Sequence, residues 1–221
     1  MKKLAIALAA LAVAATVASA AVYSQNAVGF INVEVAENEM VCLTIPFNDM
    51  ASTTGTVVFK NTQMAQDAAT GSTAYFWNGT GWTIANKTAR GFTTTKELAP
   101  GEMFFFQPAA KQTITICGEV PDEAEMTVAI AGSGNFSAIG NPYPVETTFK
   151  TTSLADGASV GAAAYFWNGT SWTIANKTAR GFTTTKVLAP GEGMFFQTHK
   201  DDPAEGSKWE VTRPFDFPAA K

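Results

Sequence analysis

The sequence predicts an all-β protein made of two tandem, homologous, β-sandwich-like units of about 90 residues each. First, Ala74–Gln107 and Ala164–Gln197 align at an offset of 90 over 34 positions, of which four differ. Second, the apolar runs are short, rich in Val, Ile, Thr, Phe and Trp, and separated by Gly, Pro and Asn, which is typical of strands in sandwiches and barrels. Third, helical periodicity is weak, apart from a turn or two near 63–68 and 152–155.

The repeat extends beyond this aligned core. Residues 32–36 resemble 127–131, and residues 43–47 parallel 139–143, at offsets of 95 and 96. We therefore place unit 1 at residues 31–120 and unit 2 at 121–221. The four differences within the core are Gly81/Ser171, Glu97/Val187, Met103/Gly193 and Phe104/Met194.

The N-terminus has the features of a secretory signal peptide. Lys2 and Lys3 precede the uncharged apolar run 4–17, and Ala18-Ser19-Ala20 fits a small-x-small cleavage site. The run is shorter than the roughly 20 residues that a membrane-spanning helix needs. We expect residues 1–20 to be removed, leaving a secreted or cell-envelope protein (periplasmic, outer-surface or extracellular) that does not insert into a membrane.

An N-terminal arm, residues 21–30, lies outside the repeat and is uncharged. Two placements are open. The arm either forms the first strand of unit 1 within the same chain, or adds as a strand to a neighbouring copy and builds a fibre or layer.

The centre of each unit predicts a β-hairpin. Asn78-Gly79 favours a two-residue type I′ turn, which places Trp77 opposite Thr80 and Tyr75 opposite Trp82. A four-residue loop over 78–81 is the alternative and pairs Trp77 with Trp82 directly. In both registers strand alternation puts the same aromatic side chains on one face.

That aromatic face carries the candidate ligand-binding residues, which are Tyr75, Trp77 and Trp82 with Tyr165, Trp167 and Trp172. Indole rings can stack on the apolar faces of sugars, so one hypothesis is a carbohydrate-binding module with two equivalent sites. The other is that these rings fill the space between two sheets, burying about 150–250 Å² each. We favour the second interpretation.

A second repeated element is a turn, Leu98–Glu102, matched by Leu188–Glu192. Pro-Gly predicts a type II turn, and the Phe-rich run after it predicts a buried strand. We interpret the repeated charges as solvated turn residues. An anion site or an Arg–Glu ion pair is the alternative. The residues concerned are Lys87, Arg90, Lys96 and Glu102 with Lys177, Arg180, Lys186 and Glu192.

The mature chain has two cysteines, Cys42 and Cys117. Because an exported protein meets an oxidising environment, we predict a disulfide between them. Two buried free thiols are the alternative.

Composition argues against several classes of function. The formal net charge of −4 becomes −6 when Lys2 and Lys3 are removed, and the remaining cations are scattered, unlike those of a nucleic-acid binder. His199 is the single histidine, so the ligands of a zinc site are missing, and the acidic patches lack the spacing of a calcium loop. We expect no enzyme activity, no metal and no cofactor.

The motif Trp77-Asn78-Gly79 with Trp82, followed by Leu98-x-Pro100-Gly101 and a Phe-rich strand, resembles exported bacterial β-rich repeat domains of unknown function. The segments 139–144 and 22–30 are similar to a unit-opening segment and an N-terminal arm of the same group. The resemblance implies an exported β domain and supplies no catalytic residues.

These features together predict an exported, non-enzymatic structural, surface or adhesive protein that acts by binding or assembly. Carbohydrate binding through the aromatic face is the alternative. The expected partners of the protein are glycans or other copies of the same chain.

Overall fold

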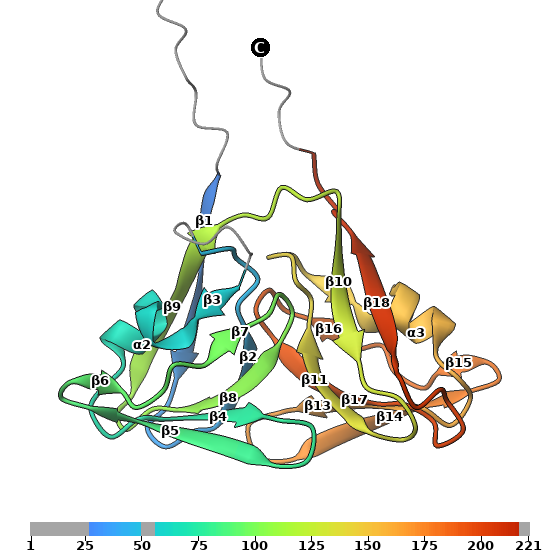
Figure 1. Cartoon of the computed structure of the whole chain (residues 1–221), viewed down its shortest axis with the longest axis horizontal. Coiled ribbons are helices and arrows are strands. Elements are labelled where there is room, and N and C mark those ends of the chain that lie inside the picture. The colour runs from blue at the N-terminus through green and yellow to red at the C-terminus, as the bar shows by residue number, and fades with distance from the viewer. Residues whose placement is uncertain (1–26, 50–55, 217–221) are drawn as a thin grey trace, which may run out of the picture.

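The computed structural model describes residues 27–49 and 56–216. The predicted signal peptide and residues 21–26 of the arm lie outside the described residues. The described chain is all-β, as predicted, and forms two similar halves that lie side by side (Figure 1).

Unit 1 contains β1 to β9, a 3-10 turn η1 and one short helix α2. Their bounds are β1 Val28–Val35, β2 Val41–Thr44, β3 Val57–Val58, η1 Phe59–Asn61, α2 Gln63–Asp67, β4 Thr73–Trp77, β5 Trp82–Thr88, β6 Gly91–Phe92, β7 Glu97–Leu98, β8 Met103–Gln107 and β9 Gln112–Glu119.

Unit 2 repeats this order with β10 to β18, η2 and α3. Their bounds are β10 Glu125–Ile130, β11 Phe136–Gly140, β12 Thr147–Thr148, η2 Phe149–Thr151, α3 Ser153–Gly157, β13 Ala163–Trp167, β14 Trp172–Thr178, β15 Gly181–Phe182, β16 Val187–Leu188, β17 Gly193–Gln197 and β18 Ser207–Thr212.

Each unit has the same three antiparallel sheets. A five-stranded sheet has the order β2-β8-β4-β5-β6 in unit 1 and β11-β17-β13-β14-β15 in unit 2. A two-stranded ribbon, β1-β9 or β10-β18, packs over it, and a short pair, β3-β7 or β12-β16, completes the unit. In Figure 1 the hairpins β4-β5 and β13-β14 run along the base and the ribbons rise above them.

Each unit has its own hydrophobic core, and each core centres on one phenylalanine. The ring of Phe59 makes edge contacts with Phe76, Phe92 and Phe104 at centroid distances of 5.0 to 5.3 Å. Phe149 makes the equivalent edge contacts with Phe166 and Phe182 in unit 2. Because the repeat preserves all of these rings except Phe104, which Met194 replaces, the two cores pack in closely similar ways.

The two predicted helical turns are confirmed as α2 and α3. Thr62 and Thr152 begin them, each accepting a hydrogen bond at 3.1 Å from the backbone N–H three residues later, as expected of an N-cap. Within the described ranges no helix has the length and apolar character needed to cross a bilayer.

The hairpin register that we favoured is wrong, and the four-residue loop is correct. Trp77 pairs with Trp82 across β4 and β5, and Tyr75 pairs with Ile84. The side chain of Asn78 decides the loop, because its Oδ1 accepts hydrogen bonds from the backbone N–H groups of Thr80 and Gly81 at 3.0 and 2.8 Å. This Asx turn replaces the type I′ turn, which would need positive φ at Asn78 as well as at Gly79.

The end of the predicted N-terminal arm belongs to unit 1. Val28, Gly29 and Phe30 form the start of β1 and pair with β9 of the same chain. The placement within the chain is therefore correct for these three residues, and unit 1 begins earlier than residue 31.

The predicted disulfide is absent, because Cys42 and Cys117 are both free thiols. On β9 the side chains of Ile114 and Ile116 enter the core. Cys117 follows Ile116 and points to the opposite face of the strand, so its side chain faces solvent. Cys42 is buried beneath the contact between the two units. The two strands lie in different sheets and direct these thiols to different environments.

The two units meet through their edge strands β2 and β11. Thr44 N–H donates to Gly191 O at 2.8 Å, and the equivalent Gly140 N–H donates to Gly101 O at 2.8 Å. Both acceptors lie in the Pro-Gly turns, where positive φ confirms the predicted conformation. The reciprocal bonds relate the units by an approximate two-fold axis.

Candidate ligand-binding groove between the two units

The structure brings all six predicted aromatic residues together at the contact between the units. Alternation along β4 sends Phe76 into the core of unit 1 and leaves Tyr75 and Trp77 on the opposite face, with Trp82 beside them on β5. The equivalent residues of β13 and β14 approach from unit 2. The aromatic rings therefore pack between two sheets, but the two sheets belong to different units and the rings stay partly exposed. They do not form two separate platforms.

These side chains line one cavity of about 570 Å³, which we call the aromatic groove. Its volume lies within the 300–1,000 Å³ that is usual for small-molecule sites. Trp82 remains 39% exposed, and the other five predicted residues are half-buried. The groove is lined by Met40, Tyr75, Trp77, Trp82, Phe105, Phe136, Tyr165, Trp167, Trp172 and Phe195.

Two phenylalanines hold the groove together from opposite units. Phe195 of unit 2 lies 5.5 Å from Trp77 and 5.7 Å from Trp82, centroid to centroid. Phe105 of unit 1 lies 5.7 Å from both Trp167 and Trp172. These edge-on pairs contribute about 0.5–1.5 kcal/mol each beyond burial, so the two units preorganise the groove jointly.

Two indole N–H groups fix the walls. Trp77 Nε1 donates to the backbone oxygen of Phe136 at 3.2 Å, and Trp167 Nε1 donates to that of Met40 at 2.6 Å. Each bond crosses from one unit to the other. These two hydrogen bonds therefore hold the rings in the walls of the groove in place.

The polar groups of the groove are few. Tyr75 Oη donates to Gln107 Oε1 at 3.1 Å, and Tyr165 Oη donates to Gln197 Oε1 at 2.8 Å, so each phenolic oxygen keeps its lone pairs. The indole N–H groups of Trp82 and Trp172 have no hydrogen-bond partner within the described part of the chain. Of the described residues, none that lines the groove carries a charge.

The sequence did not single out Met40, Phe105, Phe136 and Phe195 as groove residues. Phe105 and Phe195 were assigned to buried strands of their own units, and both are indeed buried, but against the other unit. The pattern that could have identified them is repetition, because Phe105 matches Phe195 at an offset of 90 and Met40 matches Phe136 at 96.

Cys42 lies in the layer beneath the groove, beside Met103 and Phe105. Burial raises the pKa of its thiol well above the ordinary value, and the carboxylate of Glu192 raises it further. The thiol therefore stays protonated and behaves as a small apolar side chain.

Six of the eight repeated charges have structural partners, and Arg90 and Arg180 are exposed, as expected of solvated turn residues. Lys96 Nζ lies 2.7 Å from Glu102 Oε1, and Lys186 Nζ lies 2.6 Å from Glu192 Oε1, so the carboxylates pair with lysines and not with arginines. Lys87 Nζ donates to the backbone oxygens of Ala65 and Gln66 at the end of α2. Lys177 makes the equivalent contacts with α3.

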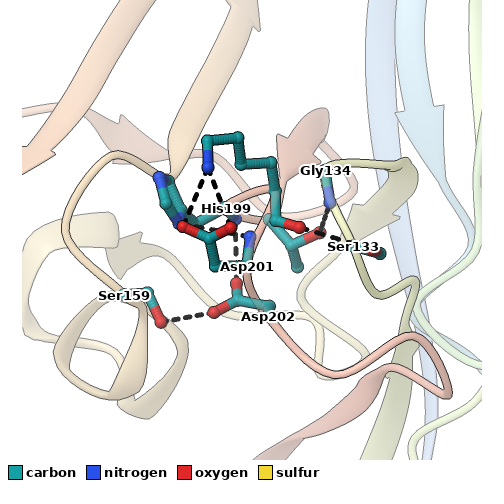
Figure 2. A network of polar contacts seen from close by, with 8 residues as sticks. Ser133, Gly134, Ser159, His199, Asp201 and Asp202 are labelled. Carbon is teal, nitrogen blue, oxygen red and sulfur yellow. Dashed lines mark hydrogen bonds and ion pairs between the residues drawn. The ribbon is translucent and has the colours of Figure 1, made fainter.

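The single histidine lies in a loop that is specific to unit 2. Asp202 organises this loop, because its carboxylate accepts hydrogen bonds from Ser159 Oγ at 2.5 Å and from the His199 backbone N–H at 2.8 Å (Figure 2). The imidazole packs against Gly161, where a Cβ would lie 2.6 Å from His199 Cδ2. These contacts stabilise the conformation of the loop.

No protein-family model matches the chain, and no curated protein or solved structure is detectably similar to it.

Proposed function

We propose that the protein is an exported, non-enzymatic surface or adhesive protein that acts by binding, and that its ligand is a carbohydrate held in the aromatic groove. The observation that carries this proposal is the solvent-open groove with four tryptophans and two tyrosines on its walls. The signal-peptide features of residues 1–20 support the export.

The balance of apolar and polar groups favours sugars over other small ligands. The C–H faces of a sugar ring match aromatic walls, and its hydroxyl groups both donate and accept hydrogen bonds. The groove offers a matching set: aromatic surface, two unpaired indole N–H groups and two phenolic acceptors. An acyl chain would leave these polar groups without partners when it excludes water, which costs free energy.

The test is calorimetric titration of the folded protein with a panel of soluble oligosaccharides, together with affinity electrophoresis in gels that contain polysaccharides. We expect binding by the native protein and its loss in the double variant Trp82→Ala/Trp172→Ala. Val160→Ala is the control, because Val160 is exposed and lies outside the groove. If the native protein binds no glycan in either assay, the carbohydrate proposal fails.

Self-assembly is a second candidate function, and one observation favours it. Phe30 on β1 is 70% exposed and pairs across the ribbon with exposed Cys117. The equivalent pair of unit 2 is Glu125 and Thr212, which are polar. A surface that is apolar in only one of two homologous units supports a contact with another copy.

Sedimentation of the mature protein over a range of concentrations tests this candidate. Phe30→Glu, which copies the residue of unit 2, is expected to lower the average mass. A native protein that stays monomeric at the highest concentration removes the candidate.

A further inference from the structure

We infer that the aromatic groove is one composite site that holds a single uncharged glycan chain across the approximate two-fold axis. This inference rests on the proposed function, and it names the ligand class and the stoichiometry of that same site. It replaces the hypothesis of two equivalent sites, one in each repeat.

The ring contacts argue for one site. Trp82 lies 5.4 Å from Phe105 and 5.7 Å from Phe195. Trp172 lies 5.7 and 5.6 Å from the same two rings. The most exposed tryptophan of unit 1 and its equivalent in unit 2 therefore share one pair of phenylalanines, so a ligand that stacks on one of them also lies against the other unit.

The charges around the groove argue for an uncharged ligand. An adjoining cavity of about 330 Å³ shares Met40 and Trp167 with the groove and contains Glu39 and Glu192. Both carboxylates are already bonded, Glu39 to the Ala36 N–H at 3.0 Å and Glu192 to Lys186. An anionic sugar would bring its charge into an apolar groove without a cation to pair with, and such desolvation is unfavourable.

The hydrogen-bonding groups argue for hydroxyl-bearing rings in both halves. Tyr75 and Tyr165 have donated their own protons to glutamines, so they can only accept from the ligand. The N–H groups of Trp82 and Trp172 can only donate. Because this set is duplicated by the two-fold axis, a chain of similar sugar units meets the same partners in both halves and in either direction.

The surface beyond the groove argues for a chain longer than one or two rings. Ile84 is 56% and Ile174 is 53% exposed. They pair across their hairpins with Tyr75 and Tyr165, so they continue the aromatic face outward from the groove in each unit. We therefore expect the site to bind the interior of a chain whose two ends extend over these isoleucines.

The probes are neutral hexamers of β-1,4-linked glucose, mannose and N-acetylglucosamine, their dimers, and a hexamer of galacturonic acid as the anionic counterpart. Calorimetry and native mass spectrometry give affinity and stoichiometry. We expect one hexamer per protein, affinity at least about tenfold weaker for the dimer, and weaker binding still of the anionic chain. Tighter binding of the anionic hexamer, or equal binding of dimer and hexamer, overturns the inference.

The two single variants Trp82→Ala and Trp172→Ala separate this inference from the proposed function. In one composite site each variant lowers the affinity for the only bound hexamer by about tenfold or more. In two independent sites each variant abolishes half of the binding and leaves the other half unchanged. The second result, or two hexamers per protein, overturns the composite site and leaves the carbohydrate function standing.

Absence of binding to every glycan overturns both proposals. Thermal unfolding of each variant shows whether it is folded. If an alanine variant does not fold, the phenylalanine variants Trp82→Phe and Trp172→Phe keep a ring at the site while removing the N–H donor. We expect them to weaken hexamer binding, and unchanged affinity in both contradicts the hydrogen-bonding argument.

Discussion

Met103 and Gly193 occupy equivalent positions in two copies that are otherwise almost identical, and the approximate two-fold axis brings them into contact. A Cβ at Gly193 would lie 2.3 Å from Met103 Cγ and 3.2 Å from Cys42 Sγ. Met103 is fully buried, so displacing it would disturb the close packing around it. A large side chain in one copy therefore requires a small one in the other, which explains this difference in the repeat.

Making the two copies identical at this position is expected to destabilise the folded protein. Gly193→Met should lower the free energy of unfolding by on the order of 1–3 kcal/mol or more, because overpacking forces the contact between the units apart. Gly81→Ser also makes one copy match the other and is the matched control, since nothing lies within 4 Å of its Cβ. We expect the control to change stability by less than about 0.5 kcal/mol. Equal urea-unfolding curves for both variants would contradict the packing argument.

The two cysteines are expected to differ in reactivity. Cys117 is exposed and should react with a thiol reagent in the native protein at neutral pH. Cys42 should react only on unfolding, because burial shields it and raises the pKa of its thiol. Counting modified thiols by mass spectrometry, with and without denaturant, checks this. Rapid labelling of Cys42 in the native state would be incompatible with its position.

At the scale of the element, the hairpin shows how one side chain selects a register. In the β4-β5 hairpin, Asn78 Oδ1 accepts the hydrogen bonds that hold the four-residue loop, so the side chain and not a type I′ backbone turn sets the register. Asn168 makes the same contacts with Thr170 and Ser171. The same Asn side chain therefore shapes the loop in both hairpins, so the effect of a substitution in one can be compared with that in the other.

Removing this acceptor should destabilise both hairpins. We expect Asn78→Ala and Asn168→Ala each to lower the free energy of unfolding by about 1 kcal/mol, the usual contribution of lost local hydrogen bonds. Their effects should add in the double variant, because the two loops share no hydrogen bond. Chemical denaturation of the three variants measures this. A neutral Asn78→Ala would mean that the backbone alone sets the loop.

At the scale of the whole molecule, duplication has created a surface that neither unit has alone. Each five-stranded sheet has one face on its own core and one face against the other unit. The edge strands β2 and β11 bring the second faces together at an angle that leaves the aromatic groove open to solvent. The groove at this surface therefore exists only through the contact between the units.

Acrylamide quenching tests that openness. Trp209 is buried in the core of unit 2, whereas the four groove tryptophans are partly exposed. We expect acrylamide to quench a large part of the emission of the folded protein, though less than in the unfolded chain. Native emission that resists acrylamide would mean that the groove is closed in solution.

The fold was largely predictable from local patterns, and the groove only in part. Alternation places Tyr75 and Trp77 on one face whichever loop joins β4 to β5, so that face was predicted despite the wrong register. The predicted disulfide was wrong, because sequence spacing does not report the orientations of Cys42 and Cys117 in different sheets. Phe195 was predicted to be buried, but not to be buried against the other unit.

The sequence by itself determined the duplicated β unit, its turns and the composition of the aromatic face, because strand periodicity and turn chemistry act within a few residues. Only the tertiary structure decided that two such faces meet as one half-buried groove. The physical reason is that their meeting depends on hydrogen bonds between distant edges, Thr44 with Gly191 and Gly140 with Gly101. The meeting of the two faces also depends on the missing side chain at Gly193, which leaves room for Met103 of the other unit.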